Sequence, residues 1–193
     1  MSADPSPTDP RSVTELLERA RGGDQGAEDA VLEVAYTELR SLAAGVFSRE
    51  RAGHTLQPTA LVSEAWLRLA PHLDRVQDRV HFFALASGTM RRVLIDHERQ
   101  RSRQKRGGDW ARITLDDHLG SARPEGIDFV ELNDLLERLS ALNARHARVV
   151  ELRIFGGLTI AESAQVLGVS DTTIETDWFT AKSWLRAELK PTG

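Results

Sequence analysis

The stretch TIAESAQVLGVSDTTIETDW, residues 159–178, has the spacing of two short helices that meet at a tight turn. Ala164 is small enough for the helices to touch, and Gly168 marks the turn between them. Ser170 precedes the second helix, where its hydroxyl can accept a backbone N–H. Apolar residues at helical spacing fill the shared core: Leu167, Val169, Ile174, Trp178, Ala181, Leu185 and Leu189. The segment predicts a helix-turn-helix, with a plain helical core and a glycine turn as the alternative.

Helical periodicity extends through most of the chain before this segment. Apolar residues recur every three or four positions in 130–142 and in 149–155, as expected for amphipathic helices. Three earlier stretches with the same period begin near Val31, Leu61 and Val80. No stretch has a convincing strand pattern or an internal repeat, so the sequence predicts an all-α fold.

The predicted helices fall into two groups. Residues 107–128 separate them and contain two glycine-rich breaks without a sustained period. We therefore expect two small helical domains, 12–106 and 129–190, joined by this flexible linker. Residues 1–11 are rich in Pro, Asp and Ser and lack the pattern of a signal peptide, which predicts a disordered tail.

The charge of the chain is distributed unevenly. The net charge of −4 by itself argues against nucleic acid, yet residues 91–106 carry seven bases and only two acids. Such a surface attracts phosphate and makes binding dependent on salt. A solvated, basic helix end explains the same pattern equally well. The adjacent pair Phe82-Phe83 could stack on bases, but its place on an apolar helical stripe favours the core.

Several functional classes find no support in the composition. The chain has no cysteine, and its six histidines show no close pairing, so we expect neither a disulfide nor a metal site. It shows no nucleophile with a base and no phosphate-cradling loop, which argues against an enzyme and against a cofactor. No apolar run approaches the roughly 20 residues that span a bilayer. Together these features favour a cytoplasmic protein without catalysis.

Taken together, the segments resemble a sigma factor of bacterial RNA polymerase, of the small two-domain extracytoplasmic-function (ECF) group. The resemblance covers about residues 12–190. The matching segments are ELRSLAAGVFSRERAGHTLQPTALVSEAWLRLA (38–70), HFFALASGTMRRVLIDHERQRSRQKRGG (81–108) and VVELRIFGGLTIAESAQVLGVSDTTIETDWFTAKSWLRAEL (149–189). Their order and separation are more specific than a lone helix-turn-helix. The resemblance implies a protein that binds core polymerase and directs it to promoters.

The resemblance assigns the first group of helices, residues 12–106, to sigma region 2. The helix at 60–70 would dock on the clamp helices of the largest polymerase subunit through Glu64, Leu67 and Arg68. The loop near 71–80 would receive a base flipped out of the minus-ten element. The following basic helix would hold the melted strand, because unstacked bases and their phosphates need a basic groove. The residues assigned to that strand are Arg91, Arg92, His97, Arg99, Arg101 and Arg103.

The second group, residues 129–190, would be sigma region 4. Its apolar surface around Leu152 and Phe155 would sit on the flap of the other large polymerase subunit. Its second helix would enter the major groove of the minus-thirty-five element. The residues assigned to that contact are Asp171, Thr172, Thr173, Glu175, Thr176 and Lys182. The linker would thread the polymerase cleft, and the free protein would be a monomer, with an anti-sigma factor as a further partner that no segment identifies.

The recognition helix departs from the family pattern. Similar chains usually carry Lys or Arg at the positions of Glu175 and Thr176, whereas residues 170–182 here hold three acids and one base. A carboxylate can accept from a cytosine amino group, and threonine can contact a thymine methyl. One interpretation is unusual minus-thirty-five recognition, with the polymerase supplying effective concentration. A second interpretation is that this group has become mainly a protein contact, which either leaves promoter choice to the first group or makes the chain a nonproductive competitor for core polymerase. A third is a free-standing helix-turn-helix regulator.

Overall fold

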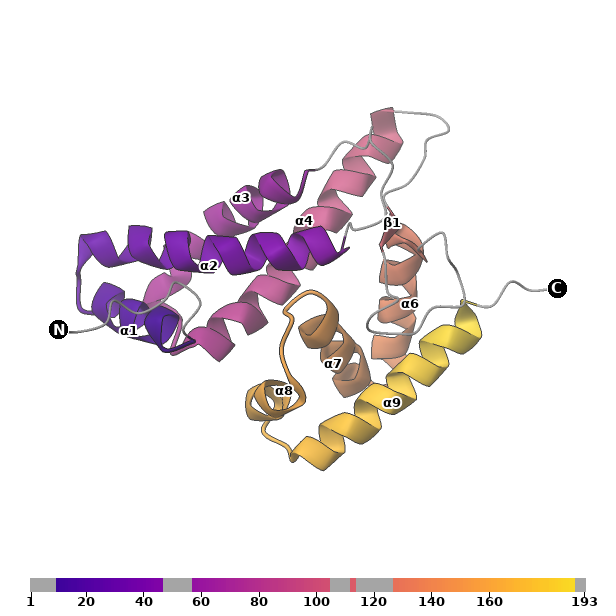
Figure 1. Cartoon of the computed structure of the whole chain (residues 1–193). Helices are drawn as coiled ribbons and strands as arrows, with labels where there is room; N and C mark the ends of the chain where they lie inside the picture. Colours follow the sequence, from indigo (N-terminus) through magenta and orange to yellow (C-terminus); the bar gives the residue numbers. More distant parts are fainter. Residues whose placement is uncertain (1–9, 47–56, 105–111, 114–126, 190–193) are drawn as a thin grey trace.

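The computed structural model describes residues 10–46, 57–104, 112–113 and 127–189. These residues form helices and one short pair of strands, so the all-α prediction is confirmed (Figure 1). The first group of helices comprises α1 (Pro10–Arg21), α2 (Gln25–Val46), α3 (Pro58–Leu69), the 3-10 helix η1 (Ala70–Arg75) and α4 (Arg79–Gln104). The second comprises α6 (Phe129–Leu142), α7 (Ala144–Ile154), α8 (Ile160–Leu167) and α9 (Asp171–Glu188).

The N-terminal helix α1 was missed by the sequence reading. It begins at Pro10, inside the stretch expected to be a tail, and proline is well suited to a first helical turn. Its side chains Val13 and Leu17 are buried in the core. Residues 1–9, the remainder of the expected tail, lie outside the described residues.

The core of the first group is built on aromatic side chains of α3 and α4. Phe82 and Phe83 are fully buried, and their rings meet edge to face with centroids 5.2 Å apart. Trp66 of α3 lies 6.4 Å from the Phe82 ring. The preference for a core role of the Phe82-Phe83 pair is confirmed, and neither ring is available to stack on a base.

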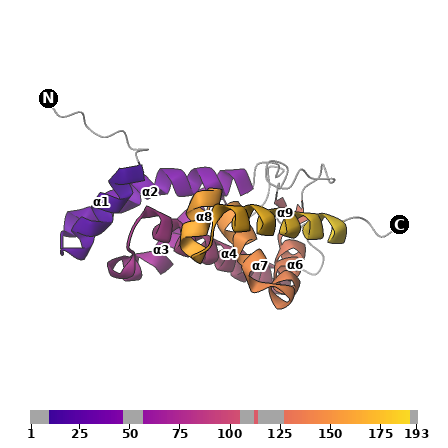
Figure 2. The same ribbon diagram turned by 90° about the horizontal axis from the view of Figure 1, so that it is seen from below.

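Helix α4 joins the two groups. It is 26 residues long and contacts α1 and α3 on one side and α6, α7 and α8 on the other. Both views place α7 and α8 beside α4 (Figures 1 and 2). Buried apolar residues from both groups form one continuous cluster. The two groups therefore pack against each other in this structure, an arrangement that the sequence did not predict.

Glycine allows α4 to approach the end of α7. A Cβ added to Gly156 would lie 3.2 Å from the Cβ of Ser87 and 2.7 Å from the carbonyl oxygen of Leu152. The first distance is tight, and the second is shorter than real side chains adopt, so only glycine fits without a shift. The close approach brings polar groups of α4 and α7 within hydrogen-bonding distance.

The two described pieces of the predicted linker lie side by side. Strand β1 (Arg112–Ile113) pairs antiparallel with β2 (Ile127–Asp128), with Arg112 opposite Asp128 and Ile113 opposite Ile127. A two-residue ladder carries almost no periodic signal, which explains why the sequence did not indicate it. The rest of 107–126 lies outside the described residues.

A pair of leucines tests this packing. Leu39 of α2 is fully buried, so Leu39→Ala should lower the free energy of unfolding by about 2–5 kcal/mol. Leu67 of α3 is 72% exposed, and Leu67→Ala should change the free energy of unfolding by less than about 0.5 kcal/mol. Urea unfolding followed by circular dichroism measures both values. Equal destabilisation by the two substitutions would contradict the packing of α2 and α3.

Candidate nucleic-acid interface

The segment 159–170 holds α8 and α9 at a fixed angle through caps and one glycine. The hydroxyl of Thr159 accepts from the backbone of Glu162, whose carboxylate accepts from the Thr159 backbone in return. Gly168 follows α8 with φ 64°, a left-handed conformation that favours glycine. The Ser170 hydroxyl then accepts from the Thr173 backbone N–H at 3.2 Å. The predicted glycine turn and serine cap are confirmed.

The inner face of α9 is the predicted apolar stripe with one addition. Its buried apolar residues are Ile174, Trp178, Ala181 and Leu185. Asp177 is buried among them, where it accepts from Arg145 Nε at 2.5 Å and contacts His146 Nε2 at 3.1 Å. The sequence-based interpretation included Asp177 among the three acids of the recognition helix. The structure corrects this, because Asp177 faces α7 and joins the two helices.

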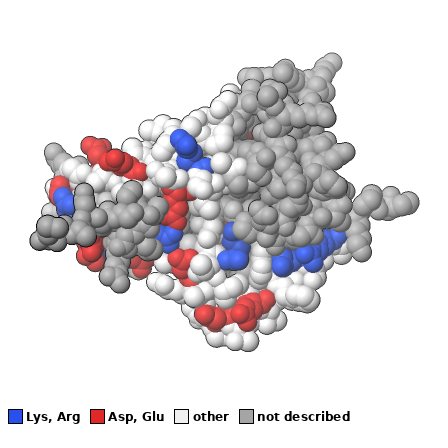
Figure 3. Space-filling view, in the orientation of Figure 1, with Lys and Arg blue, Asp and Glu red and all other residues white. Residues whose placement is uncertain are grey.

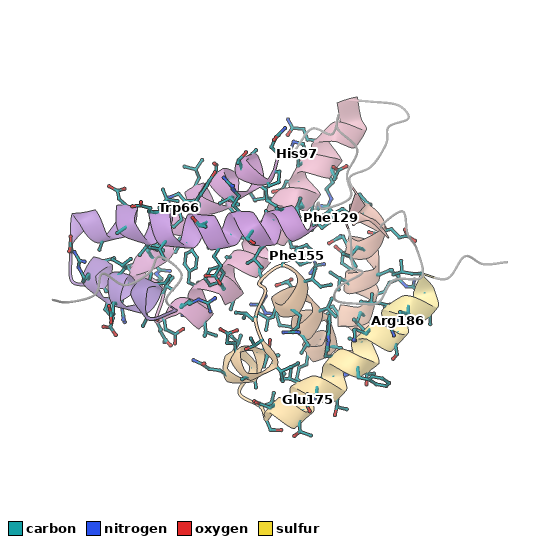
Figure 4. The ribbon with its side chains drawn as sticks, viewed as in Figure 1. Trp66, His97, Phe129, Phe155, Glu175 and Arg186 are labelled. Atoms are coloured by element: carbon teal, nitrogen blue, oxygen red, sulfur yellow. The ribbon has the colours of Figure 1, made fainter. Side chains whose placement is uncertain are left out.

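The outer face of α9 starts with polar side chains. Asp171, Thr172, Glu175 and Thr176 are exposed, and Glu175 projects from the N-terminal part of the helix (Figure 4). The Thr176 hydroxyl donates to the Thr172 carbonyl oxygen at 2.9 Å. Since this hydroxyl is bound to its own helix, Thr176 has mainly its methyl group to offer a partner. These four predicted contact residues lie together on one accessible surface.

Two further residues predicted to contact DNA have local partners. Thr173 is half-buried, and its hydroxyl lies 2.8 Å from the Ser170 hydroxyl as part of the cap. The ammonium group of Lys182 lies 5.3 Å from the centre of the Trp178 ring. Phe179, which the prediction left out of the contact set, is 69% exposed and follows Glu175 by one helical turn. In the sequence, an aromatic residue four positions after Glu175 is the signal that could have placed Phe179 among the predicted contact residues.

Apart from Glu188, which pairs with Arg138 of α6, the exposed charges of α9 differ in sign between its two halves. Acidic side chains gather near its N-terminal end and basic side chains near its C-terminal half (Figure 3). Asp171 and Glu175 belong to the first set, and Arg186 lies at the far end (Figure 4). Negative side chains near a helix N-terminus are favoured by its dipole. They also remove the phosphate attraction that a basic recognition helix would have.

The basic residues predicted on α4 do not share one environment. Arg91 is turned toward the second group of helices, and only 18% of its side chain is exposed. Arg92 and Arg99 are exposed, whereas His97 is half-buried. Figure 4 marks the position of His97 on α4. Arg101 and Arg103 lie within the helix bounds of α4, but their side chains lie outside the described residues. The structure thus separates Arg91 from the exposed members of this set.

The residues predicted to bind polymerase on α3 form one exposed face. Leu67 projects into solvent, while Arg68 donates to Glu64 at 2.7 Å and to Asp96 of α4 at 2.9 Å. The ion pair with Asp96 raises the pKa of Arg68 further above its already high value. Arg68 therefore also ties α3 to α4, a contact that sequence spacing could not indicate.

The predicted apolar surface of α7 is not exposed in this structure. Leu152 and Phe155 are fully buried, and the Phe155 ring meets Phe129 edge to face at 6.1 Å (Figure 4). The expectation that they form a docking surface needs this correction for the arrangement described here. Their helical spacing indicated an apolar face correctly, but the sequence could not show that the chain covers this face itself.

Within 10–46, 57–104 and 127–189, no cluster of three His, Asp or Glu side chains could hold a metal ion. No helix in the described part of the chain has the length and apolar character needed to cross a membrane.

The Asp177 contact predicts a pH dependence of stability. Arg145, through its hydrogen bond, is the main cause that lowers the pKa of Asp177 below its ordinary value of about 3.9. A lowered folded pKa contributes stability above the unfolded pKa, and this contribution is lost as the pH falls through the folded value. Asp177→Asn should therefore lower the melting temperature at pH 7, and its deficit should shrink below about pH 4.

The measurement is the melting temperature of both proteins from pH 7 to pH 2.5. Asp134, which is exposed on α6, supplies the control, because Asp134→Asn removes the same charge without this contact. A deficit of Asp177→Asn that stayed constant over the whole pH range would contradict the assignment.

Comparison with known proteins identifies the family of the chain. The model of the ECF sigma factor family matches residues 10–191, which includes all the helices described above. No curated protein matches the sequence. Because the family model spans nearly the full length, the chain belongs to the ECF sigma factor family and has a sigma factor role in transcription initiation.

Proposed function

We propose that this sigma factor binds core RNA polymerase through α3 and directs it to promoters, where it contacts the melted minus-ten strand and the minus-thirty-five duplex. The observation that carries the polymerase contact is Leu67. It is a large apolar side chain, 72% exposed, beside the ion pairs that fix Arg68. Membership of the ECF sigma factor family supports the same assignment.

The exposed face of α9 supports a role in reading bases. Glu175 offers a carboxylate that can accept from a cytosine amino group, and the Thr176 methyl and the Phe179 ring can contact thymine methyls. None of these groups attracts phosphate. We infer that α9 contributes discrimination between sequences, while the polymerase contact keeps α9 close to the DNA and supplies most of the affinity.

Phosphate attraction in this proposal comes from α4. Arg92 and Arg99 are exposed on it, and Arg91 would join them if the second group of helices moved away. Cationic side chains on one helix can follow the backbone of a melted strand and offset the cost of unstacking its bases. The first group would thus hold the opened strand, and the second would hold the duplex upstream.

The exposed acids of α9 favour a second candidate function. With Asp171 and Glu175 outward, α9 could contact a basic protein surface, and the chain would then compete for core polymerase without starting transcription. A free-standing regulator would bind DNA without polymerase. One experiment separates the three: co-elution with core RNA polymerase, followed by transcription from a library of random upstream sequences.

Each outcome of this experiment selects one candidate. Core binding with transcripts that share upstream motifs would support the proposal and identify the bases that α9 reads. Core binding without transcripts would favour the competitor. Retention on DNA without any core binding would favour the free-standing regulator and overturn the proposal.

Leu67 provides the direct test of the polymerase contact. Leu67→Asp should weaken binding to core polymerase by about 100-fold, as expected when a central apolar anchor is replaced by a charge. The matched control is Leu142→Asp, because Leu142 is also an exposed leucine, 69% accessible, on α6. Both variants should keep the helical circular dichroism. Similar core affinity for the two would remove α3 from the proposed interface.

Glu175 provides the test of the DNA contact. In the complex with core polymerase, Glu175→Arg should strengthen promoter binding. It should also make the fall of log affinity with log salt concentration steeper, by about 1 in the slope. Glu33→Arg, at an exposed position on α2, makes the same charge change as a control. A salt slope that Glu175→Arg leaves unchanged would contradict a DNA-facing position for this residue.

A further inference from the structure

The exposed side chains around Glu175 form a surface that is rich in hydrogen-bond acceptors and poor in donors. Asp171 and Glu175 carry carboxylates, which accept hydrogen bonds and cannot donate them while ionised. The Thr176 hydroxyl donates to the carbonyl oxygen of Thr172 at 2.9 Å, and the Thr180 hydroxyl donates to that of Thr176 at 2.9 Å. Each hydroxyl has one proton, so both protons are used within the helix. A partner of this surface must therefore supply donors or apolar groups.

The Glu175 carboxylate is available to such a partner. It projects from the N-terminal part of α9 (Figure 4), and no hydrogen bond or ion pair from the described part of the chain engages it. Asp177, two positions later, is instead buried against Arg145. Asp171 lies one turn earlier, at the helix start, where a negative charge suits the helix dipole. Glu175 is thus the acceptor at the centre of the exposed face.

Phe179 lies beside Glu175 on the same face. The two residues are one helical turn apart, which places their Cβ atoms roughly 5–6 Å from each other. The Phe179 side chain is 69% exposed. By the helical repeat, Thr176 follows on the other side of Phe179 and has its methyl group to offer. A carboxylate, an aromatic ring and a methyl group therefore adjoin one another on the surface proposed to enter the major groove.

This arrangement disfavours a purine opposite Glu175. Adenine and guanine both present the N7 acceptor in the major groove, and guanine adds the O6 acceptor. A carboxylate at that place would bring acceptors together without a proton between them. Side chains that bind purine edges supply donors, as Arg does for guanine and Asn for adenine. Residues 171–179 contain neither Arg nor Asn.

The pyrimidines differ in how well they match this surface. Cytosine offers its N4 amino group as a donor, and its ring carbon C5 lies next to that group. Thymine carries a methyl group at C5, but its O4 is an acceptor that the Glu175 carboxylate would repel. Cytosine methylated at C5 combines the amino group of cytosine with the methyl group of thymine. It is therefore the base that matches both the carboxylate and the ring.

We propose that α9 recognises 5-methylcytosine in the minus-thirty-five element, with Glu175 accepting from the N4 amino group and Phe179 packing on the C5 methyl group. This proposal rests on the proposed function, because it requires α9 to enter the major groove. Burial of one methyl group should tighten binding about four-fold. Methylation of the promoter would then increase binding of the polymerase complex.

The test uses the full chain bound to core polymerase. Duplexes with a randomised minus-thirty-five region are made in two tagged pools, one with cytosine and one with 5-methylcytosine in that region. The pools are mixed in equal amounts and incubated with the complex, and the bound duplexes are sequenced. The wild type should select cytosine at one position at least. Duplexes with that cytosine should be recovered about four-fold more often from the methylated pool than from the unmethylated pool.

Two substitutions separate the two contacts. Phe179→Ala should keep the preference for cytosine and lose the gain from methylation, whereas Glu175→Ala should lose the preference for cytosine. Leu142→Ala is the matched control, because Leu142 on α6 is also 69% exposed and should leave both preferences unchanged. All three side chains are exposed, so thermal melting followed by circular dichroism should be nearly the same for every variant.

The outcomes separate this proposal from the proposed function. Selection of cytosine with equal recovery from the two pools would overturn recognition of the methyl group and leave base recognition by α9 intact. A gain from methylation that persists in Phe179→Ala, or a motif that Glu175→Ala leaves unchanged, would overturn the contacts assigned here. Binding without any selected sequence, or no binding to core polymerase, would overturn the proposed function and this proposal with it.

Discussion

Burial of α4 on two sides is the constraint on which the rest of the structure depends. One face carries Phe82 and Phe83 into the core of the first group, and another meets α6, α7 and α8. Because one helix serves both groups, its polar residues cannot all face solvent. Arg91 is the residue where this conflict appears, and Glu151 and Asn133 resolve it with hydrogen bonds. That contact and the buried apolar residues shared by the two groups together hold α7 against α4.

The parts of the fold that follow from local chemistry could be predicted from the sequence. The hydrogen bonds of Gly168 and Ser170 involve residues within four positions of them. The turn and the cap before α9 could therefore be predicted from the local sequence. The buried stripe of α9 followed from its period. The period fails where a polar residue is buried, and Asp177 shows why: its partner Arg145 lies 32 positions away, on another helix.

The limits of the site prediction have the same origin. Spacing placed Leu152 and Phe155 on one apolar face, and that face exists. It could not show whether the partner of this face is another protein or the chain itself, since the two produce the same pattern. Arg91 and Glu151 are 60 positions apart, so a basic stretch that suggested DNA binding gave no indication that one of its members is held internally.

The burial of Asp177 changes the meaning of the unusual recognition helix. With that acid paired to Arg145, the outward start of α9 carries two carboxylates, those of Asp171 and Glu175, beside methyl and aromatic groups. Phosphates repel a carboxylate that lies near the bases, which lowers the affinity for DNA. A cytosine amino group in the right place can donate to that carboxylate, which increases discrimination between sequences. Such a helix works only if something else holds it on the duplex. The polymerase contact proposed for α3 would supply that hold, which links the acidic surface of one group to the exposed Leu67 of the other.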